Sequence, residues 1–460
     1  MIQHCPVLIV LLPLTAALLC LLFSKFNKNL GSWLVIGSIA GSLACSLQVL
    51  HQTLTSGEAI HYWMGNWEPP LGIEFVIDPL SAVMAVLITF ISLMVAVYSK
   101  PFMRKEDWLH IGGYYTLYGL LTVGLCGMVI TGDMFNLYVY LEVMSLSGYG
   151  LIAMGGKKSM LAAFRYMLIG TIGASLYLIS VAYLYAMTGT LNMADLGERI
   201  MPYLSSPPFA LAVACLFIGF GIKMALFPLH GWQPDAYNFA HPGSAAFIAG
   251  VMSKVPAYAI IRFFFYIFGV NNPIISTALT VLGILGIGGV LIGSIMALAQ
   301  YDFRRMLAYS SVAQIGYIAI GLAIGNMYGF IGAVLHIINH AFMKSALFLV
   351  IGGIQYRFGE INLYRLGGLN KKMTLSTITV ILAALSMVGI PPTAGFFSKW
   401  YLMLGAYQGG QYFYIVVLVR LLPGLRDSFM QLHDAFDEVA QLFRRQSSTA
   451  RFDHKFHTVS

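Results

Sequence analysis

Charged side chains are scarce in this 460-residue sequence: 26 Lys and Arg and 18 Asp and Glu make up 10% of it. An ordinary soluble domain carries roughly 25% charged residues. Hydrophobic residues account for 58% of the chain, which is more than the polar surface of a water-soluble globule can enclose. The composition therefore excludes a soluble enzyme and a disordered chain. It predicts a polytopic membrane protein.

Cysteine is also rare, and no Cys-x-x-Cys pair occurs. The five cysteines all lie in apolar runs: Cys5, Cys20, Cys45, Cys126 and Cys215. This spacing is not that of a disulfide framework, a zinc site or an iron–sulfur site. No glycine-rich dinucleotide motif follows a strand either. We therefore predict no cofactor, no metal site and no electron-transfer chemistry in this chain.

Long apolar runs are abundant, and a bilayer core needs about 20 apolar residues per helix. The first run is not preceded by a basic segment, so we interpret it as a span rather than a signal peptide. The sequence predicts twelve spans, at 5–24, 31–54, 78–98, 109–131, 134–154, 160–188, 207–228, 243–268, 275–299, 304–324, 327–355 and 375–407.

The net charge of +8 does not indicate nucleic-acid binding, because the basic residues lie between apolar runs rather than on one face. Loops after even-numbered spans hold only Arg199 and Arg262. Loops after odd-numbered spans hold fourteen basic residues: Lys25, Lys28, Lys100, Arg104, Lys105, Lys157, Lys158, Arg165, Arg304, Arg305, Arg357, Arg365, Lys371 and Lys372. By the positive-inside rule, the odd loops face the cytoplasm and the N-terminus lies outside. We expect the chain in the cell inner membrane.

Five ionisable residues fall inside predicted spans: Glu142, Lys223, Lys254, Lys344 and Lys399. A charged residue at a helix centre costs roughly 2.5–3.5 kcal/mol on insertion scales. One isolated lysine can extend its amine to the interface. Five such groups on different spans favour a hydrated polar path through the bundle instead.

Two of these lysines accompany prolines that interrupt a helix. Lys223 precedes Pro228 in the seventh span, and Lys399 follows Pro391 and Pro392 in the twelfth. Pro256 similarly weakens the helix beside Lys254. Two broken helices five spans apart have opposite orientations, which is typical of inverted repeats around a transport path.

The predicted fold class is thus all-α, a membrane helix bundle with inverted repeats and two broken helices. We expect N-terminal helices at 1–108, a first repeat at 109–268, an incomplete second repeat at 269–410 and a polar tail at 411–460. Within that tail, 425–445 has the pattern of an amphipathic helix.

His336, His340 and Lys344 follow one another at steps of four, so they share one face of a helix. Histidine titrates near neutral pH, so the row is suited to passing protons. Two hydrogen-bonded core histidines are the alternative. A metal site is disfavoured because the sequence offers no third ligand.

Four stretches resemble the proton-conducting antiporter family, which includes Mrp-type sodium/proton antiporter subunits and the antiporter-like subunits of respiratory complex I and of membrane-bound hydrogenases. They are TGDMFNLYVYLEVMSLSGYGLIA, FPLHGWQPDAY with AAFIAGVMSKV, LHIINHAFMKSALF, and GIPPTAGFFSKW. Together with WEPPLGIEFVIDPLSAVM, they look most similar to the D-type subunits of Mrp antiporters.

The resemblance implies a role for each of these residues. Glu142 would pair with Lys223, and Lys254 would relay protons across the midplane. The row of His336, His340 and Lys344 would continue the path, and Lys399 would be the terminal carrier. It also implies further spans after Lys399, where the sequence turns polar, so we expect either a shortened product or an unusual lineage.

The expected function is proton translocation as a subunit of a multisubunit sodium/proton antiporter. The expected partners are protons, sodium, other membrane subunits and the lipid bilayer, with no nucleic acid. A proton-pumping subunit of an NADH:quinone oxidoreductase or a hydrogenase is the alternative. A purely structural bundle is disfavoured, because stability does not call for these buried charges.

Overall fold

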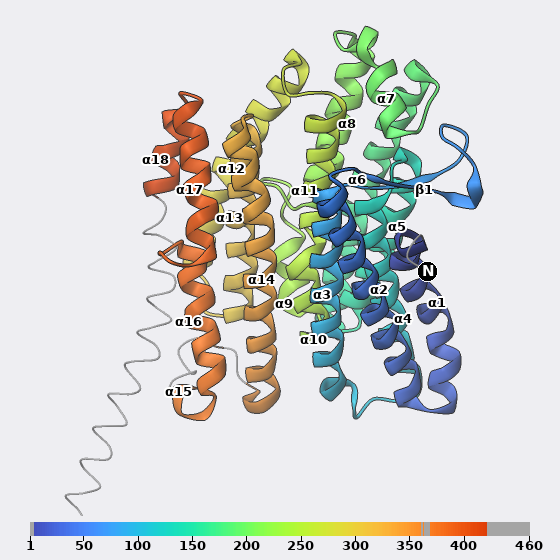
Figure 1. The fold of residues 1–460 in the computed structure, drawn as a ribbon. Coiled ribbons are helices and arrows are strands. Elements are labelled where there is room, and N and C mark those ends of the chain that lie inside the picture. The colour runs from blue at the N-terminus through green and yellow to red at the C-terminus, as the bar shows by residue number, and fades with distance from the viewer. Residues whose placement is uncertain (1–3, 360–361, 363–368, 421–460) are drawn as a thin grey trace, which may run out of the picture.

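The computed structural model describes residues 4–359, 362 and 369–420 of the chain. Nearly parallel helices form one bundle, with the first helices at one side and the last at the other (Figure 1). The predicted helical membrane fold is confirmed. The amphipathic helix predicted at 425–445 lies outside the described residues.

Nine helical segments of the described chain are long and apolar enough to cross a membrane. They are α1 (Cys5–Phe26), α2 (Lys28–Ser56), α3 (Pro79–Met103), α4 (Trp108–Ile130), α6 (Lys157–Thr188), the segment Pro242–Ile267, α12 (Pro273–Leu298), α13 (Phe303–Ala323) and α14 (Met327–Phe358).

The other three predicted spans coincide with shorter or more polar helices. They are α5 (Met134–Ala153), α8 (Pro207–Lys223), and the pair α16 (Thr374–Val388) and α17 (Ala394–Gln408). α8 and α16 are short because each ends at a break in the chain. α5 is 20 residues long but contains Asn136 and Glu142.

The segment Pro242–Ile267 is irregular, as expected beside Pro256. It consists of α10 (Pro242–Phe247), the π-helix η4 (Ile248–Met252), α11 (Lys254–Ile261) and the π-helix η5 (Arg262–Ile267). π-Turns inside helices leave carbonyl groups available and often occur at functional sites. The remaining helices are η2 (Met64–Asn66), α7 (Met193–Arg199), η3 (Met201–Tyr203), α9 (Gln233–Phe239), α15 (Leu369–Lys372) and α18 (Tyr412–Arg420).

Aspartates fix the start of four helices. Asp78, Asp107, Asp133 and Asp302 each accept a hydrogen bond from the backbone N–H three residues later, at 2.6–3.1 Å. A carboxylate in this position satisfies one of the free N–H groups of the first turn and typically contributes ~1 kcal/mol. The sequence thereby sets where α3, α4, α5 and α13 begin.

A small antiparallel hairpin was not predicted from the sequence. Strand β1 (Ile60–Trp63) pairs with β2 (Glu74–Ile77), with Ile60 opposite Ile77. The hairpin lies beside the end of the bundle that carries α7 (Figure 1). Each strand has only four residues, which is too short for a clear alternating pattern.

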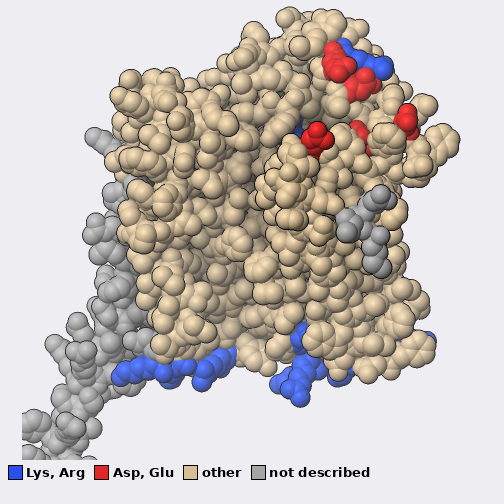
Figure 2. All heavy atoms as spheres, viewed as in Figure 1, with Lys and Arg blue, Asp and Glu red and all other residues tan. Residues whose placement is uncertain are grey.

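Charges divide between the two ends of the bundle, as Figure 2 shows: Asp and Glu dominate one end of this face, and Lys and Arg the other. The broad band between them is made of other residues. One predicted loop residue is placed differently. Arg262 lies within η5, where its two terminal nitrogens each donate to Asp78 at 2.6 Å. The ion pair holds the arginine at the end of the span, so it is not a loop charge.

Candidate functional site

All four lysines predicted inside spans are buried, and so are both histidines. Their exposed fractions are 1% for Lys223, 4% for Lys399 and 0% for Lys254, Lys344, His336 and His340. These four lysines therefore do not extend their amines to the membrane interface. Glu142 is half-buried on α5.

Glu142 and Lys223, which the resemblance pairs, are not in direct contact. Among the described residues, no ion pair joins them; the Lys223 amine donates to Ser145 Oγ at 2.5 Å and Tyr149 OH at 3.2 Å. The carboxylate acts on the amine electrostatically, from a greater distance. Ser145 and Tyr149 lie three and seven residues after Glu142, on the same face of α5. Their hydroxyl groups, rather than the Glu142 carboxylate, accept the hydrogen bonds of the Lys223 amine.

Lys254 bonds to the π-turn that precedes it. Its amine donates to the carbonyl of Ala249, five residues earlier in η4. A regular helix has no free carbonyl at this position, whereas a π-turn provides one. The irregular backbone expected from Pro256 is therefore also what holds this amine.

His336, His340 and Lys344 all lie buried on the single helix α14. α14 packs against both η4 and α17. The ring centroids of His336 and His340 are 6.3 Å apart. Lys344 donates to Leu307 O at 2.8 Å and Ser310 Oγ at 2.6 Å. Lys254 interacts electrostatically with all three members of the row.

His336 has two hydrogen-bond partners. Its Nε2 lies 2.9 Å from Gln314 Oε1, and its Nδ1 lies 3.0 Å from Ser398 Oγ. An amide oxygen can only accept, so this geometry places a proton on Nε2. Ser398 precedes Lys399, so the histidine links the row on α14 to the second broken helix.

Lys399 forms hydrogen bonds across the break between α16 and α17. Its amine donates to the carbonyls of Met387 at 2.8 Å and Val388 at 2.9 Å, and it lies 4.7 Å from the centre of the Tyr317 ring. Carbonyls at a helix C-terminus have no partner within the helix and attract cations. The break therefore builds an ammonium site from carbonyl groups, and no carboxylate of residues 4–359, 362 or 369–420 forms an ion pair with it.

Aromatic residues that the sequence analysis missed connect Lys223 to Lys254. Tyr149, which bonds Lys223, packs edge-on against Tyr166 at 4.7 Å, and Tyr166 stacks on Trp232 at 3.7 Å. Trp232 contacts Tyr237, whose hydroxyl donates to Ser253 Oγ at 3.4 Å, next to Lys254. Spacing along α5 indicates Tyr149, but no sequence signal indicates the residues contributed by other helices.

Several buried polar atoms on the elements that carry these residues lack a hydrogen-bond partner within the described residues. They are Tyr166 OH, Gln314 Nε2, Tyr317 OH and both ring nitrogens of His340. Buried polar groups nearly always bond to protein or to water, and an unpaired one costs about 1–3 kcal/mol.

The site is therefore a set of amines and imidazoles in which neutral hydroxyl and carbonyl acceptors hold the four amines. Burial disfavours the charged form of an amine, and the carbonyls and hydroxyls around it favour that form. Such groups are suited to gaining and losing protons in place. In the described part of the chain, no three His, Cys, Asp or Glu side chains lie close enough together to hold a metal ion.

Comparison with protein families gives two matches. The family described as NADH:quinone oxidoreductase/Mrp antiporter, transmembrane, matches residues 131–422. The N-terminal family of complex I chain 5 matches residues 63–110. The first match spans more than half of the chain and contains all seven predicted site residues.

Curated relatives and solved structures agree with these matches. The N-type subunit of NADH-quinone oxidoreductase from Desulforudis audaxviator is 46% identical over 91% of this chain and 83% of its own length. The D-type subunit of the Na(+)/H(+) antiporter from Alkalihalophilus pseudofirmus is 32% identical over 93% and 85%.

Two solved membrane complexes contain similar chains. In an archaeal membrane-bound sulfane sulfur reductase, the similar chain has a TM-score of 0.89 and 28% identity, covering 94% of this chain and 88% of its own. In the Mrp complex of a Dietzia species, the TM-score is 0.85 at 28% identity, covering 95% and 80%.

Proposed function

This chain belongs to the NADH:quinone oxidoreductase/Mrp antiporter family, and from that premise we propose that it translocates protons as a subunit of a multisubunit sodium/proton antiporter. Protons and sodium are the transported ions, and other membrane subunits are the partners. The subunit occupies the cell inner membrane, with the basic end of the bundle in the cytoplasm and the N-terminus outside.

One observation supports this proposal: the buried amines and imidazoles lie on elements that pack against one another, and several buried polar atoms on these elements lack a hydrogen-bond partner within the described residues. In the proposed path, Lys223 exchanges a proton under the field of Glu142. Lys254 relays it to His340, His336 and Lys344, and Lys399 is the terminal carrier. Each elementary charge that crosses the membrane corresponds to about 2.3 kcal/mol per 100 mV, so small shifts in these contacts suffice to direct flow.

The proposed division into two repeats gives each repeat one broken helix with its lysine. In the proposed arrangement, 109–268 forms one repeat around Lys223 and 269–410 a second around Lys399. Two observations support it: α6 packs against the broken α8, and α14 packs against α17 beyond the other break. The two lysines lie on different sides of their breaks: Lys223 is the last residue of α8, before the break, and Lys399 lies in α17, after the break.

A proton-pumping subunit of a quinone-reducing or sulfur-reducing complex is the second candidate. It is favoured by the 46% identity to an NADH-quinone oxidoreductase subunit and by the likeness to the archaeal reductase. The same row of residues would then respond to electron transfer in a partner subunit. The proton path is common to both candidates, and the driving reaction differs.

The test uses inverted vesicles that contain the chain with its partner subunits and a pH-sensitive dye. Adding sodium should release protons from wild-type vesicles, and Lys223→Ala and Glu142→Ala should abolish this exchange while the complex still assembles. Lys105→Gln, a charge loss at the exposed basic end, is the control. Full exchange in both alanine variants would refute the proton path, and proton uptake driven only by an electron donor would favour the second candidate.

A further inference from the structure

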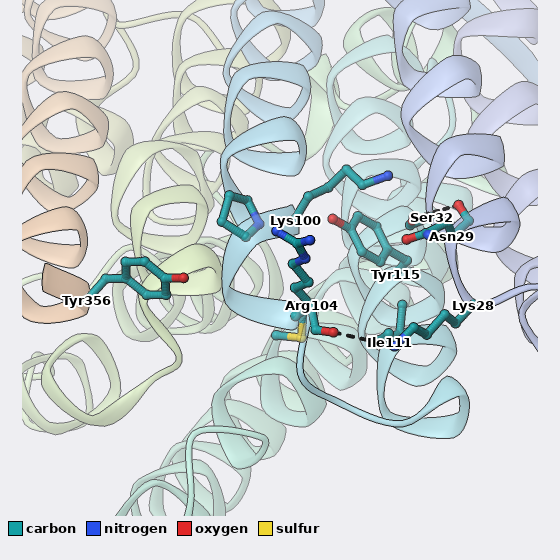
Figure 3. A pocket seen from close by; sticks show the side chains of 10 residues that line it. Lys28, Asn29, Ser32, Lys100, Arg104, Ile111, Tyr115 and Tyr356 are labelled. Carbon is teal, nitrogen blue, oxygen red and sulfur yellow. Dashed lines mark hydrogen bonds between the residues drawn. The ribbon is translucent and has the colours of Figure 1, made fainter.

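A basic cavity of about 400 Å³ opens at the end of the bundle where Lys and Arg gather, and none of the seven predicted site residues lines it (Figure 3). Its walls come from α2, α3, α4 and α14. The residues that matter below are Lys28, Ser32, Lys100, Arg104 and Tyr356.

Three cations line this cavity without a counterion. Lys28, Lys100 and Arg104 take part in no ion pair among the described residues, and no acidic residue lines the space. In the part of the chain that the structure describes, the Lys28 amine donates to the Arg104 carbonyl, at 3.5 Å. Like charges gathered around one cavity repel each other, and an anion with several oxygens relieves that repulsion.

The cavity lies at the level where a membrane meets water. Trp33 on α2 is 55% exposed, and the Lys100 amine lies 3.6 Å from the centre of its ring. Exposed tryptophan is enriched at membrane interfaces, where its ring sits among the headgroups. A ligand held by Lys100 therefore sits at headgroup depth.

An exposed apolar ridge continues from the cavity along α3. Three exposed apolar residues precede Lys100 at steps of about one helical turn. They are Val97, Met94 and Phe90, each 39–44% exposed. The Phe90 ring lies 5.9 Å from that of Phe342 on α14, so the ridge extends onto the neighbouring helix. This surface is suited to an acyl chain attached to a group in the cavity.

We propose that this cavity binds the phosphate headgroup of an anionic glycerophospholipid, with an acyl chain along the ridge of Val97, Met94 and Phe90. Lys28, Lys100 and Arg104 surround the phosphodiester. A zwitterionic lipid brings its own cation into a cavity that is already positive. A free phosphate lacks the chain that the ridge accommodates. Basic pockets between membrane helices on the cytoplasmic side recognise anionic headgroups in this way.

The test measures lipid binding to the purified full chain by native mass spectrometry. Dioleoyl phosphatidylglycerol should bind wild type at least about tenfold more tightly than dioleoyl phosphatidylcholine. Lys100→Gln with Arg104→Gln should weaken phosphatidylglycerol binding about tenfold or more, since each basic residue near a membrane surface contributes on this scale. The control is Lys25→Gln with Lys105→Gln, which removes two charges at the same end of the bundle but outside the cavity. This variant should bind phosphatidylglycerol nearly as tightly as wild type.

Three results would overturn the proposal. The first is equal weakening in both double variants, which would indicate unspecific surface charge. The second is displacement of the lipid by inorganic phosphate or glycerol 3-phosphate at equal concentration, which would indicate a soluble anion. The third is unchanged lipid binding by the Lys100 and Arg104 variant together with loss of a partner subunit when this variant is purified as the assembled complex, which would assign the cavity to a protein contact. The comparison of two lipids on wild type holds even if a variant fails to fold.

Discussion

The Lys399 amine donates a 2.9 Å hydrogen bond to the carbonyl of Val388, on the opposite side of the break in the twelfth span. Eleven positions separate the two residues along the chain, and Gly389 begins the break with φ 88°. The lysine therefore binds the end of α16 from the following helix. In this way one backbone interruption supplies the acceptors for a buried cation.

Gly389→Ala should disturb this lysine. A Cβ there would lie 3.0 Å from Lys399 Cδ, and the positive φ costs an L-residue about 1–2 kcal/mol. We expect a lower Tm and proton exchange reduced roughly tenfold or more. Gly37→Ala is the matched control, because a Cβ there meets nothing within 4 Å. Wild-type exchange in Gly389→Ala would show that the position of Lys399 does not matter for transport.

The two histidines on α14 should respond differently to replacement by leucine. His340→Leu removes no side-chain hydrogen bond to any residue that the structure describes. Tm should therefore stay unchanged or rise, while exchange falls about a hundredfold. His336→Leu leaves Gln314 Oε1 and Ser398 Oγ without this partner and should destabilise the fold by about 1–3 kcal/mol. Exchange and thermal unfolding in detergent measure both effects, and equal loss of stability in the two variants would contradict this assignment.

The hydroxyl groups on α5 should matter for Lys223 as much as the carboxylate does. Ser145→Ala with Tyr149→Phe removes both of its hydrogen-bond partners. We expect exchange to fall at least about tenfold while the complex assembles normally. Ser147→Ala, two residues from Ser145 on the same helix, serves as the comparison. If only Glu142 substitutions reduce exchange, a direct carboxylate–lysine contact is the better description.

The ion pair between Asp78 and Arg262 should make stability depend on acidity. Burial raises the pKa of the Asp78 carboxyl, but hydrogen bonds and charge from Arg262 outweigh it, so the net pKa is below the ordinary 3.8. A lowered folded-state pKa gives stability that is present above pH 3.8 and lost as pH falls through the folded value.

Asp78→Asn should therefore cost about 1–3 kcal/mol at neutral pH. It should also remove part of the acid-induced drop in Tm, because the carboxyl that becomes protonated is gone. Thermal unfolding of both proteins between neutral and strongly acidic pH tests this. Parallel Tm curves for the two proteins would mean that the pair contributes no linked stability.

Local patterns were sufficient for the helices, the breaks and the burial of the charged residues. Apolar runs indicated each span, Pro228 and Pro391 indicated both breaks, and a step of four placed His336 and His340 on one face. Each of these signals acts within a few turns of one helix, where the physics is set by neighbouring residues. The hairpin of β1 and β2 was missed because its strands are too short to carry a pattern.

The sequence by itself determined that lysines and histidines lie within the membrane, because their positions in apolar runs leave no other place for them. Only the tertiary structure decided what those residues touch. Lys223 binds Ser145 and Tyr149 rather than Glu142, and His336 reaches Gln314 on another helix. The reason is physical: a buried amine takes whichever acceptor the packing of separate helices brings within about 3 Å, and helix packing depends on contacts far apart in the chain.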